Sequence, residues 1–143
     1  MNRQLPRVYA IAAALLVTCL LAAAVQAQGL VEVEPNDSFG TANVLALNGV
    51  TEGTINPARD ADWYEFSVNQ HGELRLNISN VAEDLAVSVR VWNGDKNTLT
   101  GWYAPLAAGG NTEAVVDLPA PGRYLLEVAG GNSEQQSGQP YAL

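Results

Sequence analysis

Apolar and polar residues alternate along several short stretches of the chain, and this two-residue period constrains its fold more than any other feature. The stretches are 64–68, 74–78, 85–91, 114–118 and 124–128, with weaker runs at 44–47, 50–55 and 141–143. A period of two is typical of strands that bury one face, and each buried face needs a second sheet to cover it. The sequence therefore predicts an all-β fold, an antiparallel β-sandwich of about eight strands.

Residues typical of turns separate these runs. A turn at 71–72 is predicted to join 64–68 and 74–78 in a hairpin, and a turn at 93–95 is predicted to lead towards 99–103. No run of helical period follows residue 27, with one exception, a single helical turn at 37–42 that Asp37 or Ser38 could cap.

The first 27 residues are typical of a cleavable signal peptide. Arg3 and Arg7 precede an apolar run at 8–25, and Val25-Gln26-Ala27 places small residues where signal peptidase cleaves. We expect cleavage after Ala27, which leaves a single domain at 28–143 and a periplasmic or secreted protein. Two alternatives are an uncleaved membrane anchor and lipidation at Cys19.

Acidic residues dominate the charge of the chain. It has 15 Asp and Glu against 7 Lys and Arg, a formal charge of −8, which becomes −10 once the two leader arginines are removed. Such a chain repels nucleic acid and anionic membrane, so neither is an expected partner after signal removal. With one Cys, in the leader, and one His in 143 residues, a zinc site of Cys and His ligands and a disulfide framework are also excluded.

Three segments of the sequence resemble the bacterial pre-peptidase C-terminal domain. They are EVEPNDS at 32–38, DADWYEF at 60–66 and PGRYLLEV at 121–128. The resemblance implies a jelly-roll-like β-sandwich that is not catalytic and usually accompanies secreted peptidases. Related collagen-binding modules of clostridial collagenases share the sandwich and bind calcium. No peptidase precedes the domain in this sequence, which favours a stand-alone exported module over a processing role.

The acidic N-terminal segment is a candidate cation site. Glu32 and Glu34 are two residues apart, so in an extended chain their side chains lie on one side, roughly 6 to 7 Å apart. The resemblance implies that this segment packs near Asp60 and Asp62, and a hard cation with six to eight oxygen ligands would relieve the repulsion. The predicted calcium ligands are Glu32, Glu34, Asn36, Asp60 and Asp62. The alternative is ordinary turn chemistry, in which Asn and Asp side chains bond their own backbone and Arg59 neutralises a neighbour.

Four aromatic residues form a second candidate site, for a protein or polysaccharide ligand. Trp63 and Trp92 lie out of phase with the inward apolar residues and are predicted to face outward, and one of Trp102 and Tyr103 must be exposed if their segment is a strand. Exposed Trp and Tyr commonly anchor binding surfaces. The alternative is that each packs under a loop or covers an end of the sandwich.

Catalytic motifs are missing from the sequence. His71 has no Ser or acid at a recognisable spacing, and the sequence contains no Gly-x-Ser-x-Gly, His-Glu-x-x-His or phosphate loop. The preferred hypothesis is a stand-alone exported, non-catalytic binding module that calcium stabilises. An accessory domain aiding secretion or anchoring of an exported partner is the second hypothesis, and a small hydrolase is the third.

Overall fold

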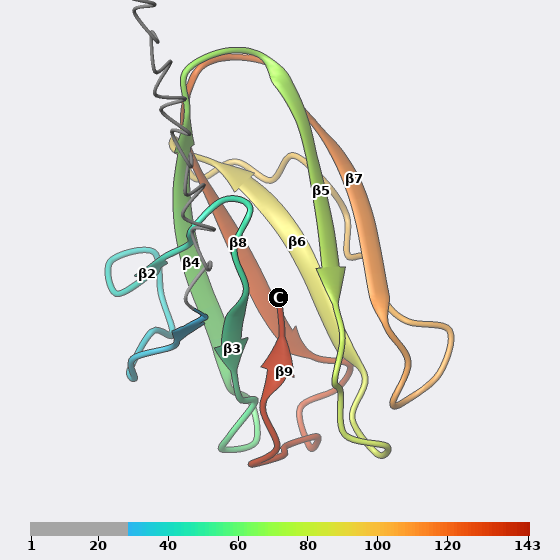
Figure 1. The fold of residues 1–143 in the computed structure, drawn as a ribbon. Helices are drawn as coiled ribbons and strands as arrows, with labels where there is room; N and C mark the ends of the chain where they lie inside the picture. Colours follow the sequence, from blue (N-terminus) through green and yellow to red (C-terminus); the bar gives the residue numbers. More distant parts are fainter. Residues whose placement is uncertain (1–28) are drawn as a thin grey trace, which may run out of the picture.

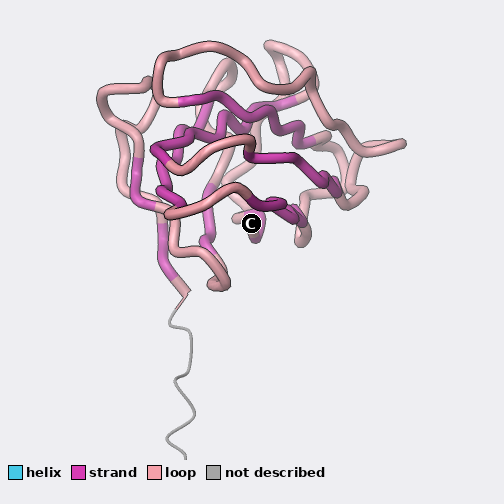
Figure 2. Tube along the Cα trace, turned by 90° about the horizontal axis from the view of Figure 1, so that it is seen from above, coloured by secondary structure: helices cyan, strands magenta, loops and turns pink. Residues whose placement is uncertain are grey.

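The computed structural model describes residues 29–143, so the predicted signal peptide and its cleavage site lie outside the described residues. The described part of the chain contains nine strands (Figure 1). In chain order they are β1 (Leu30–Val31), β2 (Asn43–Val44), β3 (Thr51–Gly53), β4 (Ala61–Val68), β5 (Gly72–Ile78), β6 (Val87–Asn93), β7 (Thr112–Leu118), β8 (Gly122–Gly130) and β9 (Tyr141–Ala142). Between residues 29 and 143 the chain contains strands, turns and loops and no helix (Figure 2), and the segment 37–42 forms a turn that is not helical.

The strands form two layers. One layer has the order β2-β4-β8-β6, in which the long strands β4, β8 and β6 are antiparallel. The other combines β1-β3-β9 with the antiparallel pair β5-β7, and an antiparallel bridge between Ser79 and Ala142 joins the two groups. The predicted β-sandwich is therefore confirmed.

Three details differ from the sequence prediction. The hairpin of 64–68 with 74–78 is wrong, because β4 pairs with β8 while β5 pairs with β7, so the turn at 71–72 crosses between layers. The sheets are mixed, since β1 pairs with β3 and β2 with β4 in parallel. Residues 99–103 form no strand and contact β6 through a bridge between Val89 and Tyr103.

The core lies between the layers and follows the two-residue period. In β7, Thr112, Ala114, Val116 and Leu118 are buried and the residues between them are exposed. The inner face of β4 carries Asp62, Tyr64 and Phe66, because alternate residues of a strand share one face. The period of two therefore places one carboxyl group, that of Asp62, on the inner face of β4 near the start of the strand, in line with two aromatic residues.

No helix among residues 29–143 is long and apolar enough to cross a membrane. The predicted alternative of an uncleaved anchor concerns residues before this range.

Candidate metal centre and aromatic face

Five carboxylates converge where the N-terminal segment meets the start of β4. Glu32, Glu34 and Asp62 place one oxygen each within 4.8 Å of one another, and Glu34, Asp37 and Asp60 form a second such group. Glu34 belongs to both groups. The two groups therefore form one continuous acidic cluster, defined here as Glu32, Glu34, Asp37, Asp60 and Asp62.

Neutral donors orient the inner part of the acidic cluster. The backbone N–H and the hydroxyl of Thr54 donate to Glu32 Oε1 at 2.5 and 2.9 Å, and the Tyr64 hydroxyl donates to Glu32 Oε2 at 3.1 Å. The Tyr141 hydroxyl donates to Asp62 Oδ2 at 2.5 Å and lies 2.8 Å from the Tyr64 hydroxyl. These contacts hold the two carboxyl groups in place but supply no positive charge.

Gly53 leaves the space that this arrangement needs. A Cβ at position 53 would lie 2.5 Å from the hydroxyl oxygens of Tyr64 and Tyr141 and 2.6 Å from Glu32 Oε2. Real Cβ atoms essentially never approach other atoms so closely, so any other residue here would displace the hydroxyls from the acidic cluster.

Buried polar atoms beside the acidic cluster lack partners. Asn36 is fully buried, and neither its Oδ1 nor its Nδ2 makes a hydrogen bond within the described chain; Asp62 Oδ1 is likewise buried and unbonded. An unsatisfied buried polar group costs about 1–3 kcal/mol, more when charged. Carboxylate and amide oxygens without partners are the donors that a hard cation such as calcium takes, so the residues present fit calcium.

The electrostatics of the acidic cluster are unfavourable without a cation. The pKa of Asp62 is raised to about 9, chiefly by burial and in smaller part by the nearby charges of Glu32, Asp60 and Glu34, despite the hydrogen bond from Tyr141. Burial also raises the pKa of Asp60 to about 6, with Asp37 and Glu34 adding to the effect. None of the five carboxylates forms an ion pair within residues 29–143.

The structure brings together the residues that the sequence analysis selected for calcium. Glu32, Glu34, Asp60 and Asp62 lie in the acidic cluster, and Asn36 donates its backbone N–H to Glu34 at 2.9 Å. The alternative of turn chemistry explains one contact of Asp60, whose carboxylate accepts the backbone N–H of Asn56 at 2.7 Å. It does not explain the side chain of Asn36, which is buried and makes no hydrogen bond in the described chain. Calcium binding itself stays a prediction.

Sequence reasoning missed four contributors to this site. Asp37 follows Asn36 in the segment but was not among the predicted ligands, and Thr54, Tyr64 and Tyr141 were read only as strand residues. A polar hydroxyl at the tip of an inward-facing tyrosine was the available clue for the last two, because buried tyrosine hydroxyls need partners.

A group of aromatic side chains lies on the outer side of the β4-β8-β6 sheet, and it is called the aromatic face here. It consists of Phe39, Trp63, Trp92 and Trp102. The Arg90 guanidinium lies 4.5 Å from the ring centre of Trp92 and 4.4 Å from that of Trp102, and it donates to Glu127 at 2.5 Å. Trp92 also donates its indole N–H to Glu127 at 3.0 Å. Trp102 is 44% exposed and Tyr103 is half-buried; the prediction for this pair assumed a strand, which the segment does not form.

The prediction that Trp63 is exposed is wrong, since this residue is 6% exposed. Its phase does place it on the outer side of the sheet, apart from the core between the layers. Phe39, from the loop before β2, covers it with a ring-centre distance of 4.3 Å, and Trp92 lies 5.6 Å from Trp63 and 5.3 Å from Phe39, so the three rings form one group. Trp92 is half-buried in the same group, which leaves Trp102 as the most accessible tryptophan of the described chain.

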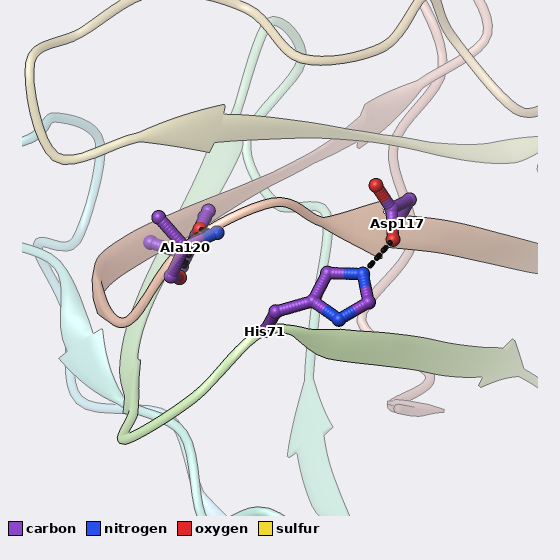
Figure 3. Close-up of polar contacts among 4 residues, drawn as sticks. His71, Asp117 and Ala120 are labelled. Atoms are coloured by element: carbon purple, nitrogen blue, oxygen red, sulfur yellow. Dashed lines mark hydrogen bonds and ion pairs between the residues drawn. The ribbon is translucent and has the colours of Figure 1, made fainter.

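His71 forms a surface contact with a single acid. Its Nε2 lies 3.1 Å from Asp117 Oδ1, and both side chains are about 70% exposed (Figure 3). Neither residue lines a groove found in the described structure. An exposed pair of this kind contributes little to stability, and no nucleophile hydrogen-bonds to the ring.

Comparison with known proteins supports a single family. The profile of the bacterial pre-peptidase C-terminal domain matches residues 60–130. The crystal structure of the pre-peptidase C-terminal domain of collagenase from Bacillus anthracis has a similar fold, with a TM-score of 0.55 and 19% sequence identity over 71% of this chain and 90% of that chain. No curated protein matches the sequence.

Proposed function

Because the chain belongs to the bacterial pre-peptidase C-terminal domain family, whose members are generally non-catalytic modules, we propose that it is an exported binding module stabilised by calcium. The leader at 1–27 supports export to the periplasm or the medium. The observation that carries the calcium proposal is the acidic cluster, together with the buried and unpartnered side-chain oxygens of Asp62 within it and of Asn36 beside it.

Calcium would fasten the N-terminal segment to the sandwich. Glu32, Glu34 and Asp37 belong to that segment, whereas Asp60 immediately precedes β4 and Asp62 is its second residue. Each of the two sets of three carboxylates is a candidate site for one cation, and Glu34 belongs to both sets. Calcium takes six to eight oxygen ligands in flexible geometry, whereas magnesium demands a near-ideal octahedron, so calcium suits this irregular set better.

Isothermal titration calorimetry tests the calcium proposal. We expect heat on adding calcium to the wild-type protein, a much weaker response to magnesium, and loss of the calcium signal in Glu34→Gln. Glu113→Gln is the matched control, because Glu113 is an exposed acid on β7 outside the acidic cluster. Calcium that produces no binding heat in the wild type, or binds equally to Glu34→Gln, would overturn the proposal.

The aromatic face is the proposed surface for a protein or polysaccharide. Trp102 is 44% exposed, and its ring packs against the guanidinium of Arg90. Arg90 is itself held in place by an ion pair with Glu127. An aromatic side chain held in place binds at low conformational cost, and this favours it as an anchor. The strongly acidic chain makes nucleic acid an unsuitable partner.

A sedimentation assay with fibrillar collagen, cellulose and chitin tests this surface. We expect Trp102→Ala to weaken binding to whichever substrate retains the wild-type protein by about tenfold or more, the loss typical of an interface anchor. Leu106→Ala is the control, since Leu106 is a fully exposed apolar residue in the same connection between β6 and β7. Equal retention of both variants would assign binding to another surface.

A further inference from the structure

A groove of about 680 Å³ separates β5 from the loop at 45–50, on the opposite layer from the aromatic face. Leu74 and Leu76 of β5 line one wall, Leu45 and Leu47 of the loop line the other, and Leu118 contributes from β7. Leu47 and Val50 are 43% and 47% exposed, so the loop wall presents apolar surface to solvent. The groove is therefore open, and its lining combines these apolar residues with polar ones that include Glu73, Arg75 and Asn77.

One wall of this groove is an unpaired strand edge. Ser79 and Ala142 exchange two backbone hydrogen bonds of 2.8 Å, so the peptide groups of Ser79 point towards β9. Peptide groups alternate in direction along a strand, so those of Glu73, Arg75 and Asn77 point the same way, into the groove. Within residues 29–143, β5 pairs with β7 on one side, and on the other side only the bridge at Ser79 follows it. The backbone groups of Glu73, Arg75 and Asn77 that point into the groove therefore have no partner in the described chain.

β9 marks how a strand would lie in the groove. It runs antiparallel to β5 and to β3, and its last residues point into the gap between β5 and the 45–50 loop (Figure 1). Leu143 exchanges backbone hydrogen bonds of 2.8 Å with Thr51 and, with Ala142, lines the end of the groove. A strand that continues this direction would lie opposite Asn77, Arg75 and Glu73 in turn.

We propose that the groove is a docking site for one extended peptide segment of a partner protein, antiparallel to β5, with apolar side chains at every second position. Its backbone would pair with Glu73, Arg75 and Asn77, and its apolar side chains would face Leu74 and Leu76. The 45–50 loop forms the opposite wall of the groove, and this favours one inserted segment over the edge strand of a folded second copy. The excess of acids in the chain favours basic residues at the ends of the segment.

Extending the full chain after Leu143 tests whether the groove accepts a strand. In the extension Thr-Val-Thr-Val-Thr-Val the valines fall opposite Leu76, Leu74 and Gly72 and face inward, whereas in Val-Thr-Val-Thr-Val-Thr they face solvent. The first extension is expected to raise the melting temperature and to slow amide hydrogen exchange at Arg75 and Asn77, and the second is not. Equal behaviour of the two extensions, which have the same composition, would overturn the proposal.

A free peptide tests docking in trans. Lys-Thr-Val-Thr-Val-Thr-Val-Lys, added to the unextended protein, is expected to shift the amide resonances of Arg75 and Asn77. N-methylation of its threonines should abolish the shift, because their N–H groups face β5, while N-methylation of its valines should preserve it. The absence of any shift, or protection of these amides that grows with protein concentration without peptide, would refute the proposal, the second by assigning the edge to another copy of this chain. The groove is separate from the acidic cluster, so this result is independent of calcium binding.

Discussion

Without a cation, the buried acid Asp62 makes the stability of the folded chain fall as pH rises. Asp62 is fully buried, and its pKa rises from 3.8 to about 9, chiefly because burial penalises the charged form. Between these two values the folded chain keeps a proton on Asp62 while the unfolded chain has lost it. Unfolding then releases a proton, so raising the pH favours the unfolded state.

The size of this effect follows from the linkage of one proton to folding. Each pH unit between the two pKa values changes the free energy of unfolding by about 1.4 kcal/mol. Asp60, with a pKa of about 6, adds to the slope mainly below pH 6, so the interval from pH 6 to 8 isolates Asp62. Across these two pH units the metal-free protein should lose about 3 kcal/mol.

Urea unfolding of protein freed of metal by chelation and dialysis measures this slope. We expect the free energy of unfolding to fall from pH 6 to pH 8 in the wild type, and to be nearly flat in Asp62→Asn, which keeps an oxygen for the Tyr141 hydroxyl and removes the charge. Asp117→Asn, an exposed carboxylate, is the control and should keep the wild-type slope. A wild-type stability that is constant or rises over this interval would refute the reasoning.

Two further substitutions test the packing described above. Gly53→Ala should destabilise the protein by about 1–3 kcal/mol, measured by urea unfolding, because its Cβ would overlap the hydroxyls of Tyr64 and Tyr141; unchanged stability would show that the hydroxyls move freely. Phe39→Ala should cost about 2 kcal/mol and shift tryptophan emission to longer wavelength, because Phe39 covers Trp63; an unchanged emission spectrum would contradict that cover.

The period of two predicted which residues form strands, but it did not predict their partners. Both β4 and β5 place alternate residues on their inner face, and this pattern is the same whether two strands pair in one sheet or face each other across the core. The hairpin assigned to them failed for that reason. Parallel pairing of the two-residue strands β1 and β2 leaves no periodic trace, because two residues contain no full repeat.

The same limit explains the outcome at the candidate sites. The phase of Trp63 predicted its side of the sheet correctly, but Phe39, 24 positions earlier, decides that it is buried. The convergence of Glu32 and Glu34 with Asp60 and Asp62 was expected through family resemblance, since spacing along the chain does not bring the two segments together. The place of Asp37 in the acidic cluster depends on how the N-terminal segment folds, so the sequence alone did not predict it.

Thermal unfolding of residues 28–143, in excess calcium and in chelator at pH 7.5, tests the calcium proposal most directly. A metal that binds only the folded state adds about 2.7 kcal/mol at one hundred times its dissociation constant. The proposal predicts a higher melting temperature in calcium for the wild type, and no calcium-dependent shift in Glu34→Gln, the residue common to both carboxylate groups. Identical melting temperatures of the wild-type protein in calcium and in chelator would contradict it.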